Sequence, residues 1–229
     1  MLIEFMGLPG VGKSTIAREL CARLRASGYR LTLAPDGFVY AHAAALRAYK
    51  LARVAAQAVL DPAGTLTAVG TGRLFPQPSP AMALRLLHNW LYIHALYAVP
   101  PRPSELVVLD QGLGQALYSL ALQSDDTWPL AVRRVLARSR FPDLVVTVEA
   151  PAATVRERMR NRTASYTPTE RLLLADEAWL RRSARIFDGV RQLLRERQVP
   201  LLCCNSHAQA LPAIVDLVTG AVARRLSAS

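Results

Sequence analysis

The sequence has few cysteines and no long apolar run. The three cysteines, Cys21, Cys203 and Cys204, are too few for a secreted disulfide framework and lack the spacing of a metal site. They are typical of small buried side chains in a reducing cytoplasm. The longest apolar candidate, 86–99, is interrupted by polar residues such as His88 and falls short of the roughly 18 apolar residues that a membrane span requires. We therefore expect no membrane partner.

We also expect no leader, and the acidic residues are fewer than the basic ones. The first strand candidate begins at Leu2 with no basic region before it, so we expect a cytoplasmic location. The chain has 17 Asp and Glu residues and 28 Lys and Arg residues, which gives a formal net charge of +11. This charge fits a nucleic-acid surface, a basic cleft for a polyphosphate, or an arginine-rich proteome. The arginine clusters at 156–162 and 181–197 have no RNA-binding motif beside them, which favours the cleft and the general bias over nucleic acid.

The apolar pattern predicts one α/β domain over residues 1–229. Short apolar strands that alternate with helices are typical of a parallel sheet covered on both faces. The five predicted strands are Leu2–Met6, Arg30–Ala34, Leu106–Leu109, Leu144–Glu149 and Pro200–Cys204. The predicted helices span 13–26, 40–60, 80–98, 112–123, 127–138, 151–162, 168–197 and 207–227. Glycines and prolines predict loops at 70–80 and 100–103.

Residues 7–14 fit the phosphate-binding pattern G-x-x-x-x-G-K-[ST], between a strand and a helix. Such a unit aims backbone N–H groups and the positive end of a helix dipole at one point, where a polyphosphate fits. Lys13 is expected to reach the β- and γ-phosphates, and the Ser14 hydroxyl to ligate Mg²⁺. The expected nucleotide-binding residues of this loop are Gly7, Gly10, Val11, Gly12, Lys13, Ser14 and Thr15.

Two carboxylates follow strands of the predicted sheet, at the edge where open α/β sheets bind ligands. Asp36 follows the second strand; it could take a proton from a substrate hydroxyl, hold a water on Mg²⁺, or simply form a turn with Gly37. Asp110 ends the third strand in the form of a Walker B strand and is expected near Mg²⁺. A helix N-cap is the alternative for Asp110.

Basic and amide side chains follow the last two strands. Arg158 and Arg162 are four residues apart on one predicted helical face, where guanidinium groups can fork onto phosphate oxygens. A solvated basic face is the alternative. Asn205 follows the fifth strand, where an adenine ring could pack against the backbone. The Asn-Lys-x-Asp pattern that reads guanine is missing there, which favours ATP.

The order of these features resembles that of the P-loop nucleoside and nucleotide kinases, and thymidylate kinase-like proteins are the most similar. The segment from Glu149 through Arg158 to Arg162 resembles their fourth strand and LID arginines. The resemblance implies a three-layer P-loop NTPase fold, with a five-stranded parallel sheet flanked by helices. It also implies transfer of the γ-phosphoryl group of Mg-ATP to a small-molecule acceptor. A LID at about 158–174 would close over ATP, and about 36–100 would bind the acceptor.

Two departures from the thymidylate kinase pattern change the expected acceptor. The neutral Gln111 stands where those enzymes have an arginine that holds the acceptor phosphate, and Ala34 replaces another arginine. A neutral acceptor with a hydroxyl, such as a nucleoside, is therefore favoured over dTMP.

The alternative function is a P-loop ATPase, switch or pseudo-kinase that acts through partner binding. The chain carries its own arginines, which favours the kinase. The apolar helices at 40–60 and 80–98 leave room for a homodimer interface.

Overall fold

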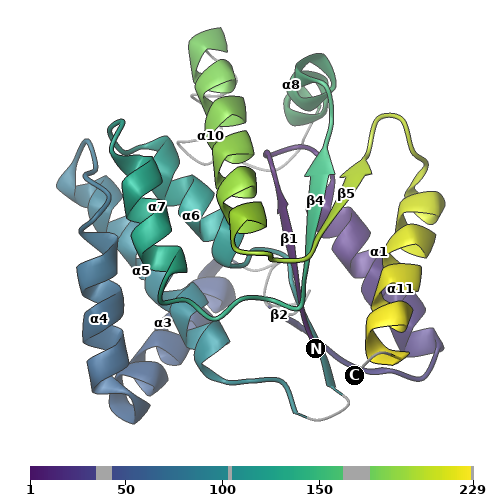
Figure 1. Cartoon of the computed structure of the whole chain (residues 1–229), viewed down its shortest axis with the longest axis horizontal. Helices are drawn as coiled ribbons and strands as arrows, with labels where there is room; N and C mark the ends of the chain where they lie inside the picture. The colour runs from purple at the N-terminus through teal and green to yellow at the C-terminus, as the bar shows by residue number, and fades with distance from the viewer. Residues whose placement is uncertain (35–42, 103–104, 162–175, 228–229) are drawn as a thin grey trace.

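The computed structural model describes residues 1–34, 43–102, 105–161 and 176–227. Five parallel strands form one sheet in the order β2-β3-β1-β4-β5 (Figure 1). The strands are β1 (Leu2–Gly7), β2 (Arg30–Ala34), β3 (Glu105–Leu109), β4 (Leu144–Glu149) and β5 (Leu201–Asn205). The predicted five-stranded parallel sheet is confirmed, and the five strands differ from their predicted bounds by one residue at most.

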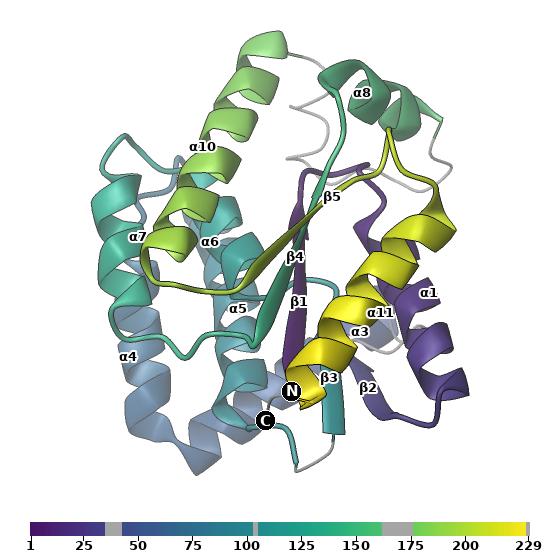
Figure 2. The ribbon, with the colours of Figure 1, turned by 45° about the vertical axis from the view of Figure 1, so that its right-hand side comes forward.

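Helices cover both faces of the sheet, which gives three layers (Figures 1 and 2). One face carries α1 (Lys13–Ala26) and α11 (Leu211–Ser227), and α8 (Ala152–Arg160) packs with them from beyond the carboxyl ends of the strands. The other carries α5 (Pro80–Ala98), α6 (Leu113–Leu122), α7 (Trp128–Leu136) and α10 (Glu177–Glu196). Side chains alternate along a strand, so Ile3 and Phe5 of β1 pack in the first layer and Leu2 and Met6 in the second. This double burial explains why the central strands β1 and β4 are mainly apolar.

The connection between β2 and β3 contains a helix that we did not predict. After α3 (Ala43–Leu60), Asp61 accepts a hydrogen bond from the N–H of Gly64 and caps α4 (Pro62–Gly72), which begins with proline at its first position. The expected loop at 70–80 is therefore wrong for residues 70–72, which are helical. Three glycines in 11 residues hid this helix, because glycine has a low intrinsic helix propensity.

Two other helices begin later than expected. The helix predicted from 207 begins at Leu211, because the preceding residues form a turn closed by Asn205. The helix predicted from 168 is α10, which Asp176 caps by accepting from the N–H of Ala178; residues 168–175 lie outside the described residues.

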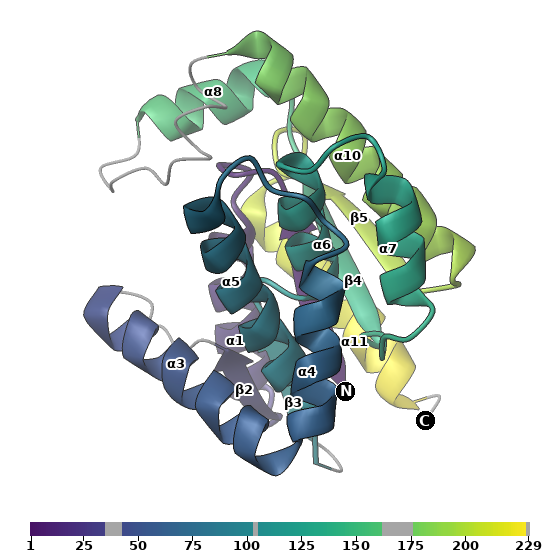
Figure 3. The same cartoon turned by 90° about the vertical axis from the view of Figure 1, so that its left-hand side faces the viewer.

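Helices α3 and α4 lie beside α5 at one edge of the molecule (Figure 3). They expose large apolar side chains: Leu51, Val59 and Leu60 of α3 and Leu66 of α4. The homodimer stays a prediction, since a single chain does not show what covers this face. No helix within the described ranges is long and apolar enough to cross a membrane.

Candidate active site

The loop between β1 and α1 has a backbone that favours glycine. Gly10 and Gly12 have φ values of 82° and 97°, in the left-handed region. A side chain at Gly10 would also meet α8, because its Cβ would lie 2.9 Å from the Cγ of Met159. Helix α1 begins directly after Gly12, so the unpaired amides of its first turn face this loop. This is the backbone arrangement of a phosphate site at a helix N-terminus.

Lys13 lies folded back over the loop. Its Nζ donates to the carbonyl oxygens of Gly7 at 2.7 Å and Leu8 at 3.0 Å. The amide of Gly7 donates in turn to Oε1 of the buried Gln115, at 3.0 Å. The ammonium group is thus held at the rim of the same loop whose amides would bind a phosphate.

Ser14 and Asp110, the two residues expected to hold Mg²⁺, meet at the edge of the sheet. The Ser14 hydroxyl donates to Oδ2 of Asp110 at 2.9 Å. Asp110 is buried, and its Oδ1 has no hydrogen-bond partner among the described residues. Since a buried carboxylate oxygen normally has a partner, this oxygen is suited to a cation or a water on that cation.

This donor set fits Mg²⁺. Mg²⁺ prefers oxygen ligands and is usually held by one or two carboxylates together with substrate phosphates and water. The hydroxyl of Ser14 and the open oxygen of Asp110 provide such ligands beside the phosphate loop. Within the described residues, no three His, Cys, Asp or Glu side chains come together, so a metal site built from protein ligands alone is not formed there.

The alternative role of Asp110 as a helix cap is wrong. The N-cap of α6 is Gly112, which has no side chain to accept a hydrogen bond. The cap comes instead from Glu4, in the middle of β1. Glu4 Oε2 accepts from the N–H of Leu113 at 2.6 Å, and Oε1 accepts from the N–H of Gly114 at 2.9 Å.

Glu4 is fully buried and is enclosed by hydrogen-bond donors. The hydroxyl of Tyr97 donates a short hydrogen bond to Glu4 Oε2. Gly112 is required beside it, because a Cβ there would lie 2.0 Å from that oxygen. Burial raises the pKa of Glu4, and the hydrogen bonds from Tyr97, Gly114 and Leu113 offset part of that effect. We missed this residue, although a lone acid within the apolar run 2–6 was the available signal.

Arg158 joins α8 to the phosphate loop and to the loop after β5. Its Nη1 donates to the Ser206 hydroxyl at 2.9 Å and to the Val11 carbonyl at 3.4 Å, and its Nη2 donates to the Ser206 carbonyl at 2.8 Å. The guanidinium group therefore lies at the carboxyl edge of the sheet, beside the phosphate loop, as the sequence predicts.

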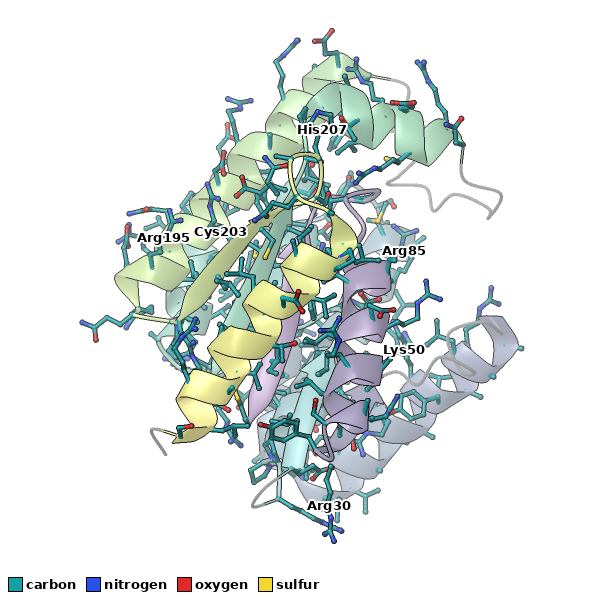
Figure 4. All side chains as sticks on the ribbon, turned by 90° about the vertical axis from the view of Figure 1, so that its right-hand side faces the viewer. Arg30, Lys50, Arg85, Arg195, Cys203 and His207 are labelled. Carbon is teal, nitrogen blue, oxygen red and sulfur yellow. The ribbon has the colours of Figure 1, made fainter. Side chains whose placement is uncertain are left out.

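Asn205 lies at the same edge, where its side chain closes a turn. Oδ1 accepts from the N–H groups of His207 at 2.9 Å and Ala208 at 3.0 Å. Figure 4 shows His207 in this turn, and its Nδ1 lies 3.1 Å from the Thr154 hydroxyl of α8. The side chain of Asn205 thus has a structural role, and its contact with a nucleotide stays a prediction.

Not all of the predicted site residues lie in the part of the chain that the structure describes. Asp36 and Arg162 fall in the segments 35–42 and 162–175, outside the described residues, as does most of the expected LID. Thr15 is exposed in the first turn of α1, and Val11 is buried. Of the predicted catalytic residues, the structure therefore brings together Lys13 and Asp110, through the loop and Ser14, with Arg158 beside them.

The middle region contributes buried aromatic side chains. Trp90, Tyr92 and Tyr97 of α5 are all buried. Lys50 of α3 donates to Asn89 Oδ1 at 2.9 Å, and its Nζ lies 4.8 Å from the ring centroid of Tyr92. Figure 4 labels Lys50 and, at the start of α5, Arg85. Lys50 of α3 thus packs on α5 within this region, and the role of the region in acceptor binding stays a prediction.

Comparisons with known proteins give the fold. No protein-family model and no curated protein matches the sequence. Three solved structures of deoxyadenosine kinase from M. mycoides match over 97–98% of this chain and 99–100% of theirs. Two of them contain bound dCTP and dATP, and the third contains the products dCMP and a flexible dCDP. The TM-scores are 0.53, 0.54 and 0.55 at 15–16% identity, so the likeness shows a shared fold.

Proposed function

We propose that this chain transfers the γ-phosphoryl group of ATP to a hydroxyl of a nucleoside-like small molecule. The observation that carries the proposal is the hydrogen bond from Ser14 to the buried Asp110 beside Lys13, with one Asp110 oxygen open. A hydroxyl, an acid and an ammonium group around a glycine loop are the parts that phosphoryl transfer needs. The fold shared with deoxyadenosine kinases supports the same function.

Each group has a role that follows from its position. Lys13 would neutralise charge on the β- and γ-phosphates, while the loop amides hold the chain of phosphates in place. Ser14 and Asp110 would hold Mg²⁺, which would balance the remaining phosphate charge. To reach the phosphates, Lys13 would leave the carbonyls of Gly7 and Leu8, which it contacts through a flexible side chain.

The reaction also requires a group that accepts the hydroxyl proton. The acceptor oxygen would form a bond to the γ-phosphorus as the bond to ADP breaks, and a carboxylate would take the proton. Asp36 and Asp110 are the two candidates from the sequence. The hydrogen bond that Asp110 accepts from Ser14 and its place beside the metal ligands favour the metal role for Asp110. We therefore assign the base to Asp36.

Arg158 and Arg162 would stabilise charge on the transferring group. Arg158 already lies against the Val11 carbonyl of the phosphate loop. Because α8 carries this arginine within the same chain, no partner is needed to provide it. This observation favours a kinase over the ATPase or switch, whose arginine often comes from a partner.

The acceptor is proposed from chemistry and from the neighbours. Gln111 follows Asp110 in the sequence and has no charge to hold an acceptor phosphate. A neutral nucleoside is therefore a better acceptor than a nucleoside monophosphate such as dTMP. Deoxyadenosine is the first candidate, because the matching structures are deoxyadenosine kinases.

An ADP-release assay tests the proposal. The protein is incubated with Mg-ATP and, in turn, with deoxynucleosides, ribonucleosides, nucleoside monophosphates and sugars. We expect release to rise with a nucleoside, and Lys13→Ala to lower it by about 10³-fold or more, because a charge on the reacting phosphates is lost. Arg25→Ala, at an exposed position in the last turn of α1, is the matched control and should be unchanged. ATP binding with no acceptor-dependent release would favour the switch or pseudo-kinase instead.

A further inference from the structure

A cavity of about 620 Å³ lies between α4, α5 and the end of α7. Trp90 and Ile93 of α5 and Val135 of α7 form part of its apolar wall. The indole N–H of Trp90 donates to the Ala68 carbonyl of α4 at 2.9 Å, which fixes this wall. The volume lies within the usual range of small-molecule sites, about 300–1,000 Å³.

The lining of the cavity contains no residue of the phosphate loop, although it reaches Leu113, three residues after Asp110. Its lining includes Ala98 at the end of α5 and Arg140, which precedes β4. Chain segments that lead into parallel strands lie at the amino edge of a sheet, whereas the phosphate loop follows β1 at the carboxyl edge. Lys13, Ser14 and Asp110 are not part of the lining.

Three arginines line one side of this cavity: Arg134 of α7, and Arg138 and Arg140 in the segment that follows it. None of the three forms an ion pair or a side-chain hydrogen bond with any residue that the structure describes. The adjacent Arg133, on another face of α7, does pair with Glu196 at 3.1 Å. Positive charge is thus gathered at the cavity without a described acidic partner.

Two polar side chains line the cavity, where a bound ligand would contact them. His94 of α5 lines it, and its buried Nε2 has no partner among the described residues. Burial holds the pKa of His94 below its ordinary value, so the ring is neutral near pH 7. Tyr97 lines it too, and its hydroxyl is the one that holds Glu4. An occupant would therefore touch the network that fixes the start of α6.

We infer that this cavity is a second ligand site, which takes a small organic anion: an apolar body with a carboxylate, sulfonate or phosphate group. The apolar wall would bury the body, and the arginines would bind the anionic group through charge-assisted hydrogen bonds. This inference does not rest on the phosphate loop, although the α4 and α5 part of the lining lies within the region 36–100 that the sequence assigns to the acceptor.

The competing explanation is that the arginines only stabilise the end of α7. Cations near a helix C-terminus interact favourably with the helix dipole, and Arg133 and Arg134 both lie in the last turn. That role needs no cavity and would not distinguish Arg134 from Arg133. A binding experiment separates the two explanations.

The probe is 1-anilinonaphthalene-8-sulfonate, which combines an apolar ring system with one anionic group and gains fluorescence in apolar surroundings. We expect one saturable site in the full chain. The double variant Arg134→Gln/Arg138→Gln should weaken binding by at least about tenfold, since two charged partners are lost. Arg133→Gln, the neighbour outside the cavity, should leave binding unchanged. Equal affinity in the double variant and the parent protein would overturn the inference.

Two further variants locate the bound probe. Ala98→Trp keeps all three arginines and places an indole in the cavity, in the space that the rings of the probe would occupy, so it should also abolish binding. Lys13→Ala alters the phosphate loop alone, so it should bind the probe as the parent does. Probe binding that survives Ala98→Trp or is lost in Lys13→Ala would place the site elsewhere and refute the assignment. Thermal unfolding of each variant shows that the compared proteins are folded.

Discussion

The two buried carboxylates among the described residues, Glu4 and Asp110, lie near one another but are treated differently by the fold. Glu4 accepts hydrogen bonds on both oxygens, from Tyr97 and from two amides of α6. Asp110 accepts one bond from Ser14, and its other oxygen is left open. We call the surroundings of Glu4, which Tyr97, Leu113 and Gly114 form, the closed region. The surroundings of Asp110 and Ser14, where one carboxylate oxygen can take a further partner, are the open region.

The difference separates a structural acid from a functional one. Leaving a buried acceptor unsatisfied costs about 1–3 kcal/mol, so a fold keeps one where something else fills it. Both oxygens of Glu4 accept hydrogen bonds, and Glu4 serves as the cap that Gly112 cannot supply. Its position fixes the start of α6, three residues after Asp110. The closed region therefore holds the open one in place.

Asp110→Asn should produce the largest effect, and only on catalysis. We expect kcat to fall by about 10²-fold or more, because the amide is a poor ligand for Mg²⁺. The melting temperature should barely change, because asparagine can still accept the Ser14 hydroxyl. Steady-state kinetics and thermal unfolding on the same preparation measure both. An unchanged rate would remove Asp110 from the metal site and break the comparison.

Glu4→Gln should have the opposite signature, a loss of stability. In the variant, the amide NH₂ group would point at a donor that bonds to a carboxylate oxygen in the parent protein. Losing that hydrogen bond should lower the free energy of unfolding by about 2 kcal/mol. For a chain of this size that corresponds to a decrease of about 4–8 °C in the melting temperature. Glu19→Gln, on the exposed face of α1, is the matched control and should change nothing. A stable Glu4→Gln protein would show that the cap is dispensable.

Arg158→Ala should have a smaller effect, at the boundary of the open region. We expect kcat to fall by about tenfold, because the transition state loses one hydrogen bond from a charged group. The KM for ATP should change little. Arg160→Ala, at an exposed position of the same helix, serves as the control. A rise in KM with kcat unchanged would mean that Arg158 contributes to binding alone.

The sequence predicted the open region better than the closed one. The phosphate loop and Asp110 follow local rules, because a glycine loop between a strand and a helix fixes its own geometry. Glu4, in contrast, acts on residues more than a hundred positions away, at Leu113 and Gly114. No local pattern contains that contact. The same reason hid α4, whose glycines oppose a helix that packing against α5 supports.

The pH dependence of stability gives the smallest and most specific test of the closed region. Burial raises the pKa of Glu4 above its ordinary value of 4.5, so the folded chain holds this proton more tightly than the unfolded chain. The contribution of Glu4 to the free energy of unfolding is then full below that ordinary value and is lost as the pH rises through the raised pKa. Urea unfolding measured from below pH 4.5 upward should show a decreasing free energy of unfolding in the parent protein. The free energy of unfolding of Glu4→Gln should depend less on pH. A parent profile that instead rises relative to the variant would mean that the three donors outweigh burial and keep Glu4 ionised.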